Sequence, residues 1–229
     1  MQNIIMEKHI VSKKYDQAFI TGCDEGHAWM LPWFVKNYKR HNSTPLIFSD
    51  FGVSEKTLEY VRREFHCVLD MTKVKEAGWF KKPRSMLYAP AKKTVWIDTD
   101  CEILDNIEDI FNKLVPNKLA MVEDKPWSKR RGELWHNSGI VGFIGKPIIL
   151  HNWCQKVHDD PLVGDQEVLH SMVRKDSLSR QIYIEDLPNE YNWLRLQLDQ
   201  GHDSKRKKIM HWTGNKGKDK IRRLIKKNG

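Results

Sequence analysis

The sequence predicts an α/β fold in which helices flank a mostly parallel central sheet within a single domain. Short apolar runs alternate with segments of helical periodicity, which favours parallel strands joined by right-handed crossovers. The length of 229 residues and 40% hydrophobic content suit one large α/β domain. No internal repeat, low-complexity segment or linker divides the chain.

The first hundred residues contain strand patterns separated by helical ones. One helix should follow a cap at Asp24 and run to about Lys39 despite Pro32. A second should begin after an N-cap at Ser54, and a third should open near Pro83. The strands expected around these helices are Tyr15–Thr21, Pro45–Ser49, Cys67–Leu69 and Thr94–Ile97.

The pattern becomes less regular after residue 100. Asp105 and Glu108 have the spacing of a capping box for a helix that reaches Leu114. Residues 125–135 are polar and aromatic without a clear period. The remaining expected elements are strands at Leu119–Val122 and Ser138–Ile144 and a helix at Asp165–Val173.

The net charge of +9 is concentrated at the end of the chain. Residues 201–229 hold eleven Lys or Arg and two Asp, so that 11 − 2 = +9. The first 200 residues hold 39 − 11 = 28 basic and 30 − 2 = 28 acidic side chains, which cancel. The basic tail can contact an anionic membrane surface or another polyanion, or it can be a solvated terminal helix.

Membrane insertion and secretion are disfavoured by the sequence. No apolar run approaches the roughly 18 residues of a membrane span, and charged residues interrupt Met1–Asp16. The four cysteines are dispersed, without the paired spacing of a zinc site or redox couple. Reduced thiols in a cytoplasmic protein are therefore expected, although disulfides remain open.

Two carboxylates, Asp98 and Asp100, follow the strand pattern that ends at Ile97. If the strand continued, residues at i and i+2 would point to the same face. Paired oxygen ligands at the carboxyl edge of a parallel sheet suit a hard divalent cation that keeps positions open for phosphate oxygens. A solvated strand end followed by a helix cap is the alternative.

Four segments in order carry a family resemblance. They are an Asp-x-Asp motif in Trp96–Asp100, an Asn-Ser-Gly motif in His136–Val141, an Asp-Gln-x-x-Leu motif in Gly164–Leu169 and a His-x-x-Gly motif in Ile209–Gly214. Together they resemble GT-A fold glycosyltransferases of the glycogenin-like and lipopolysaccharide galactosyltransferase-like group, and the likeness runs from Tyr15 to about Lys218. The chain departs from that group after His211, because Gly217 stands where the family commonly has a lysine.

The resemblance implies a metal-dependent transfer of a sugar from a nucleoside diphosphate, with UDP expected first, to a hydroxyl of a glycan, glycoprotein or glycolipid. Asp98, Asp100 and His211 would hold Mn²⁺ or Mg²⁺. Residues 15–114 would form the nucleotide-sugar-binding half and residues 115–200 the acceptor-side half. Residues 201–229 would form a basic C-terminal segment that carries His211.

Further residues are expected around the donor. The end of the first strand points to Thr21 and Gly22, although these can equally form a strand exit and turn. By resemblance, retention of configuration is expected, with Asp165 and Gln166 beside the anomeric carbon; Asp165 can alternatively be a helix N-cap. The resemblance also assigns the donor to Lys82, Arg84, Asp124, Asn137, Gly214, Lys216 and Lys218.

Two other functions fit part of the sequence pattern. Haloacid-dehalogenase-type phosphatases also use Asp-x-Asp after an apolar strand, but Glu102 stands where their pattern requires Thr or Val, and several strand patterns precede Asp98. A nucleic-acid-binding module would use the C-terminal lysines and Lys129–Arg131. A neutral body without an aromatic-platform motif argues against nucleic acid as a partner.

Overall fold

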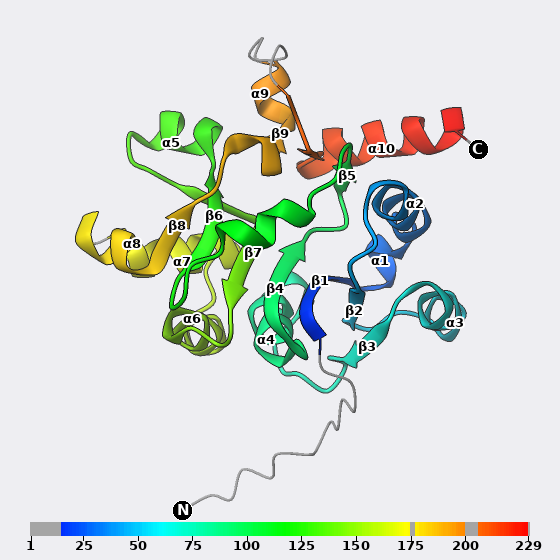
Figure 1. Cartoon of the computed structure of the whole chain (residues 1–229), viewed down its shortest axis with the longest axis horizontal. Helices are drawn as coiled ribbons and strands as arrows, with labels where there is room; N and C mark the ends of the chain where they lie inside the picture. The colour runs from blue at the N-terminus through cyan, green and yellow to red at the C-terminus, as the bar shows by residue number, and fades with distance from the viewer. Residues whose placement is uncertain (1–14, 175–176, 200–205, 229) are drawn as a thin grey trace, which may run out of the picture.

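Seven strands form a central sheet in the computed structural model, which describes residues 15–174, 177–199 and 206–228 (Figure 1). Strand β7 is antiparallel to both of its neighbours, whereas the other adjacent pairs of this sheet are parallel. The mostly parallel sheet is therefore confirmed. Across the sheet the order is β3 (Cys67–Asp70), β2 (Leu46–Asp50), β1 (Tyr15–Cys23), β4 (Ala91–Ile97), β7 (His136–Ile144), β6 (Leu119–Glu123) and β8 (Ile184–Asp186).

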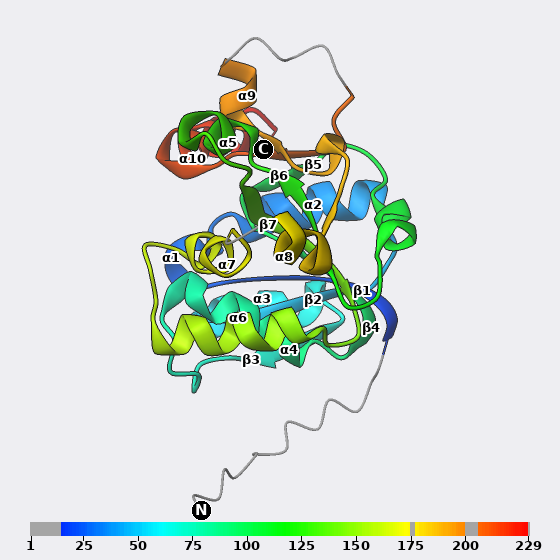
Figure 2. The same cartoon turned by 90° about the vertical axis from the view of Figure 1, so that its left-hand side faces the viewer.

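Helices cover both faces of the sheet and enclose two apolar cores. Because successive strand residues point to opposite faces, Phe19 belongs to one core while Ala18 and Ile20 belong to the other. The first core is covered by α2 (Leu31–His41), α3 (Glu55–Glu64) and α10 (Gly214–Asn228). The second is covered by α4 (Lys82–Tyr88), α6 (Ile148–Asp159) and α7 (Asp165–Val173), with α4 and α6 side by side (Figures 1 and 2).

The shorter elements complete the chain. The remaining helices are α1 (Glu25–Ala28), α5 (Lys125–Arg131), α8 (Ser177–Tyr183) and α9 (Arg195–Asp199). Three 3-10 helices occupy Gly78–Lys81, Glu108–Lys113 and Asn189–Tyr191. A three-stranded sheet is ordered β5 (Cys101–Ile103), β10 (Ile209–His211) and β9 (Trp193–Leu194). Its β10–β5 pairing brings the C-terminal segment to the end of β4, because β5 follows β4 after a turn.

The single helix predicted from Asp24 to Lys39 is wrong, because α1 ends at Ala28 and α2 begins at Leu31. Pro32 lies at the start of α2, where a backbone N–H would have no partner within the helix. The chain therefore stops one helix and starts a second rather than accommodating a proline in mid-helix.

Two further expectations are corrected, and one segment without a sequence prediction contains a helix. Asp105 and Glu108 do not cap an α-helix, because Glu108 accepts hydrogen bonds from Ser43 and Thr44 and begins a 3-10 helix. Residues 98–100 form a turn instead of extending β4, since the Cys101 N–H donates to the Asp98 carbonyl at 3.1 Å. Residues 125–135, which show no period, contain α5; Gly132 ends this helix at a φ of +69°.

The helices and the cysteines bear on the expectations about membrane insertion and disulfides. Among the described residues, no helix has both the length and the apolar character needed to cross a membrane. Cys23, Cys67, Cys101 and Cys154 are free thiols, as their dispersed spacing suggested. Residues 201–205 of the predicted basic segment lie outside the described residues, and α10 forms most of the rest.

Candidate active site

A cleft of about 430 Å³ opens at the carboxyl edge of the parallel strands. It is lined by the end of β1, the turn after β4, the start of β7, the start of α7 and the junction of β10 with α10. Open α/β sheets bind ligands at this edge because loops diverge there and leave a crevice. The cleft is therefore where the fold places a ligand.

The described lining of the cleft contains more carboxylates than cationic side chains. The acids are Asp24, Asp98, Asp100, Asp124, Asp165 and Glu167, and the lysines are Lys82 and Lys218. Such a surface repels an anionic ligand unless a further cation accompanies it. A diphosphate bound here would therefore face more acidic than basic side chains.

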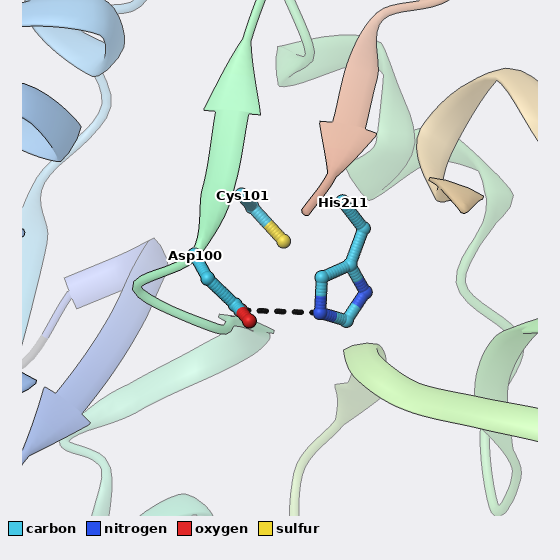
Figure 3. A group of neighbouring side chains, drawn as sticks. All are labelled: Asp100, Cys101 and His211. Atoms are coloured by element: carbon cyan, nitrogen blue, oxygen red, sulfur yellow. Dashed lines mark ion pairs between the residues drawn. The ribbon is translucent and has the colours of Figure 1, made fainter. Parts of the chain in front are cut away.

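The two aspartates of the turn and His211 converge in this cleft. His211 Nε2 lies 3.1 Å from Asp100 Oδ1 and 3.9 Å from Asp98 Oδ2, and its side chain is almost fully buried. Figure 3 shows Asp100 and the His211 ring facing each other from the two neighbouring strand segments. The turn thus brings both carboxylates to the imidazole that β10 supplies.

The two ring nitrogens of His211 have different partners. Nδ1 lies 3.0 Å from Asn192 Oδ1, which only accepts hydrogen bonds, so Nδ1 carries a proton and donates it. Nε2 is the nitrogen that faces Asp98 and Asp100: it pairs with Asp100 when it carries a proton, and it would offer its lone pair to a metal when the imidazole is neutral. Asn192 is fully buried and donates in turn to Asn137 Oδ1 at 2.8 Å.

The charges of His211 and Asp100 shift each other's pKa values in opposite directions. Burial disfavours a charged imidazole, yet the carboxylates of Asp100 and Asp98 outweigh it and raise the pKa of His211. Burial likewise opposes ionisation of Asp100, but His211 and Lys218 outweigh it and lower its pKa.

Cys101 is the third side chain of a compact cluster with Asp100 and His211 (Figure 3). Burial, together with the carboxylates of Asp100 and Asp98, raises the pKa of its thiol well above the ordinary value. A metal ion deprotonates a thiol that it binds, so Cys101 stays among the potential donors. The carboxylates and the imidazole nitrogen are donors that fit Mn²⁺ or Mg²⁺.

Lys82 links the aspartate turn to α7. Its Nζ lies 3.1 Å from Asp98 Oδ1 and 3.0 Å from Asp165 Oδ2, and its side chain is 5% exposed. Burial disfavours the charged amine, but Asp165 and Asp98 outweigh it and raise the pKa of Lys82. Burial raises the pKa of Asp165, although Lys82 opposes this. Asp165 is the first residue of α7 after Gly164, and therefore not its N-cap.

A network of side-chain amides joins β7 to α7 on the floor of the cleft. Asn137 Nδ2 donates to Asp124 Oδ2 at 3.1 Å and to Gln166 Oε1 at 3.0 Å. The β7 strand bulges here, because its register with β6 shifts between Met121 and Val122. Such bulges redirect side chains at the ends of strands. Asn137 and Gln166 are thereby held together at the cleft.

Gly139 permits the close approach of β7 to His211. A Cβ at this position would lie 2.2 Å from His211 Cε1 and 2.6 Å from its Nδ1. Any larger residue would displace the imidazole from the aspartates. The Asn-Ser-Gly motif thus supplies the Asn137 oxygen that accepts a hydrogen bond from Asn192, and the space at Gly139 that the His211 ring needs.

Lys216 and Lys218, both on α10, lie differently relative to the cleft. Lys218 lines the cleft and its Nζ lies 2.8 Å from His27 Nε2, whereas exposed Lys216 is not among the lining residues. A Cβ at Gly217 would lie 1.9 Å from the Trp212 carbonyl oxygen, so a side chain would force the helix away. The contact between α10 and Trp212 therefore accounts for the glycine at this position.

Most of the predicted residues meet in the cleft. Three do not line it: Thr21 is fully buried, Arg84 pairs with Glu76 at 2.6 Å, and Lys216 is exposed. Sequence reasoning missed Asn192 and His27, because a lone Asn or His carries no periodic signal. The predicted residues that line the cleft are Gly22, Lys82, Asp98, Asp100, Asp124, Asn137, Asp165, Gln166, His211, Gly214 and Lys218.

No protein-family model and no curated protein matches the sequence. Solved structures do match. The apo-form glycosyltransferase GlyE of Streptococcus pneumoniae is 17% identical with a TM-score of 0.66, and the match covers 88% of this chain and 55% of that chain. Galactosyltransferase LgtC, solved in complex with donor and acceptor sugar analogs, is 14% identical with a TM-score of 0.60, and covers 91% of this chain and 94% of that one.

A third match is mouse xyloside xylosyltransferase 1 in its apo form, with 15% identity, a TM-score of 0.52 and coverage of 89% of this chain and 98% of that one. The chain thus spans about half of the length of GlyE, but nearly all of LgtC and of the mouse enzyme. At these identities the likeness establishes the fold. The chain has the GT-A fold, as the four ordered motifs predicted.

Proposed function

We propose that the protein is a metal-dependent glycosyltransferase that moves a sugar from a nucleoside diphosphate, UDP first, to a hydroxyl acceptor. The observation that carries the proposal is the convergence of Asp98, Asp100 and the Nε2 atom of His211 in an acid-rich cleft. The GT-A fold supports it, and the LgtC complex with sugar analogs supports sugars as partners. In contrast to the phosphatase pattern, the motif follows the fourth strand of the chain.

The chain's own residues would divide the work along the cleft. Asp98, Asp100 and His211 would hold the metal, and Lys218 would turn from His27 toward the diphosphate. When bound, a divalent cation would act as a Lewis acid that neutralises the departing diphosphate. Asp124 and Asn137 would bind the sugar hydroxyls, since carboxylate and amide groups together accept and donate hydrogen bonds.

Retention of configuration is the expected stereochemical course. Gln166 and Asp165 would lie beside the anomeric carbon, while Lys82 keeps Asp165 in place. The bond from the anomeric carbon to the diphosphate oxygen breaks, and the acceptor oxygen bonds to the same face. The acceptor proton passes to the departing oxygen, so no further base is required.

Ligand binding tests the donor and the metal together. A thermal-shift panel of nucleoside diphosphate sugars, each with and without Mn²⁺, should show a metal-dependent rise in Tm for a UDP-sugar, because ligands that bind the folded state stabilise it. Asp100→Asn should abolish that rise and the accompanying hydrolysis or transfer. Asp160→Asn, a change at the exposed end of α6, should behave as wild type. Full turnover in Asp100→Asn, or after chelation, would refute the proposal.

The stereochemistry needs a separate measurement. Proton NMR of the first-formed product should show the anomeric configuration of the donor. An inverted linkage would exclude retention while leaving the metal-dependent transfer intact.

A further inference from the structure

A second cavity of about 360 Å³ adjoins the cleft. It lies between α5 and α9, which are neighbours in space (Figure 2), and it is lined by Pro126, Trp127, Lys129, Arg130 and Leu196. Trp127 and Leu196 also line the cleft. The two cavities therefore share a wall, and a ligand longer than one sugar can extend from one into the other.

The charge of the second cavity is opposite to that of the first. Its described lining contains two cations, Lys129 and Arg130, and no acid. Neither cation makes an ion pair with a carboxylate in the described part of the chain. Arg130 and Arg131 instead lie over the Trp127 ring, with guanidinium carbons 5.6 and 4.7 Å from its centroid. Neighbouring cations without acidic partners repel one another, and an anion between them would relieve that repulsion.

The amide network of the cleft fixes the position of α5, the helix that carries Lys129 and Arg130. Asp124 Oδ1 accepts a hydrogen bond from the Trp127 N–H at 3.1 Å and so caps α5, while its Oδ2 accepts from Asn137 and Gln166. Trp127 and Arg130 are three residues apart and share a face of the helix. One carboxylate thus ties the sugar-binding floor to the cationic cavity.

We propose that the second cavity binds an anionic group, phosphate or carboxylate, carried by the saccharide acceptor. This inference rests on the proposed function and deepens it by naming the acceptor class. The acceptor hydroxyl would lie in the cleft, its next sugar against Trp127, and its anionic group between Lys129 and Arg130. The edge of the Trp127 ring can pack on the C–H face of a sugar, while the adjacent cations pair with the negative charge that the sugar carries. This combination suits a charged saccharide.

Binding of small saccharides tests the proposal with the donor cleft filled. Saturation-transfer NMR with UDP and Mg²⁺ present would compare methyl glucoside with glucose 6-phosphate and with methyl glucuronide. Both anionic probes should bind about 10-fold more tightly than the neutral one, a difference typical of one charge-assisted contact. Lys129→Gln with Arg130→Gln should remove the preference, and Arg130→Lys, which keeps the charge, should retain part of it.

A matched pair of changes controls for net charge. Lys56→Gln with Arg63→Gln removes the same charge from exposed positions of α3, at the opposite edge of the sheet, and should keep the preference. Equal affinity for neutral and anionic probes in wild type would overturn the proposal. So would a preference that survives in the Lys129→Gln, Arg130→Gln variant, or tighter binding of an oligothymidine at the same turn. Absence of a UDP-induced rise in Tm would instead refute the donor assignment. The two measurements thus show whether the donor proposal or the acceptor proposal has failed.

Discussion

At the scale of single residues, Asn192 determines which nitrogen of His211 faces the aspartates. Its Oδ1 can only accept, so it holds the proton on Nδ1. Removing a group that orients a metal-ligating histidine typically lowers metal affinity about 10- to 100-fold. Under the proposed function, Asn192 would therefore be a positioning residue.

Replacing Asn192 with Ala should weaken Mn²⁺ binding about 10- to 100-fold, because the imidazole loses its fixed tautomer and orientation. Titration of Mn²⁺ in the presence of UDP, followed by electron paramagnetic resonance, measures this. Asn37→Ala is the control, since the Asn37 amide nitrogen on α2 is buried without a partner among the described residues. Unchanged affinity in Asn192→Ala would exclude the positioning role.

Gly139 is the second residue with a specific expected effect. Gly139→Ala should displace His211 and lower Mn²⁺ affinity at least about 10-fold, while overpacking destabilises the fold by about 1–3 kcal/mol. Gly142→Ala on the same strand is a matched control, because its Cβ would meet the Leu114 side chain at 2.4 Å, away from the cleft. If both variants bound Mn²⁺ equally well, Gly139 would serve packing alone.

At the scale of elements, Glu108 joins the 3-10 helix Glu108–Lys113 to the segment between α2 and β2. Partial burial opposes its ionisation, but hydrogen bonds from the backbone N–H groups of Ser43 and Thr44 outweigh this and lower the pKa of Glu108 from 4.5 to about 2. Because the folded-state pKa is the lower one, the ionised carboxylate stabilises the fold above pH 4.5. That stabilisation disappears as the pH falls through about 2.

Glu108→Gln should therefore lower the free energy of unfolding by about 1 kcal/mol at neutral pH, a figure that allows for solvent screening of a partly exposed group. The difference from wild type should shrink between pH 4.5 and about 2. Urea unfolding at a series of pH values measures it. Glu59→Gln, at an exposed position of α3, should stay within about 0.5 kcal/mol of wild type throughout. A gap that stays constant with pH would contradict the assignment.

At the scale of the whole molecule, α10 accounts for much of the positive charge. Ile221 on this helix is fully buried, and Leu224 and Ile225 pack partly against the same core. The apolar face is thus used within the protein, while Lys226 and Lys227 are exposed. Contact with an anionic membrane would depend on charge alone.

Binding to vesicles that contain phosphatidylserine should accordingly be weak and should fall steeply as salt rises from 0.05 to about 0.3 M, where the Debye length shortens. Lys226→Gln with Lys227→Gln should weaken it by about fivefold per lysine, or about 1 kcal/mol each. Co-sedimentation at fixed lipid measures both. Binding that resists salt, or that neutral vesicles reproduce, would contradict a purely electrostatic contact.

The sequence predicted the main strands because a strand that is buried on both faces of a parallel sheet has a continuous apolar sequence, as in Leu46–Phe48. It missed β5, β8, β9 and β10, whose two or three residues pair only through tertiary contacts. It missed α5 because two helical turns are too short to show a period. The ordered motifs predicted Asp98, Asp100 and His211, but a buried amide such as Asn192 has the same sequence signature as any polar residue.

Because β10 lies between β5 and β9, side chains that meet in the cleft come from segments that are synthesised at different times. Asp100 leaves the peptidyl-transfer centre 211 − 100 = 111 residues before His211. At about 5–20 residues per second, the delay is on the order of 6–20 s. During that interval a nascent chain carries the aspartates without their imidazole. The three side chains can come together only once the segment that contains His211 has been synthesised and β10 has joined its partners.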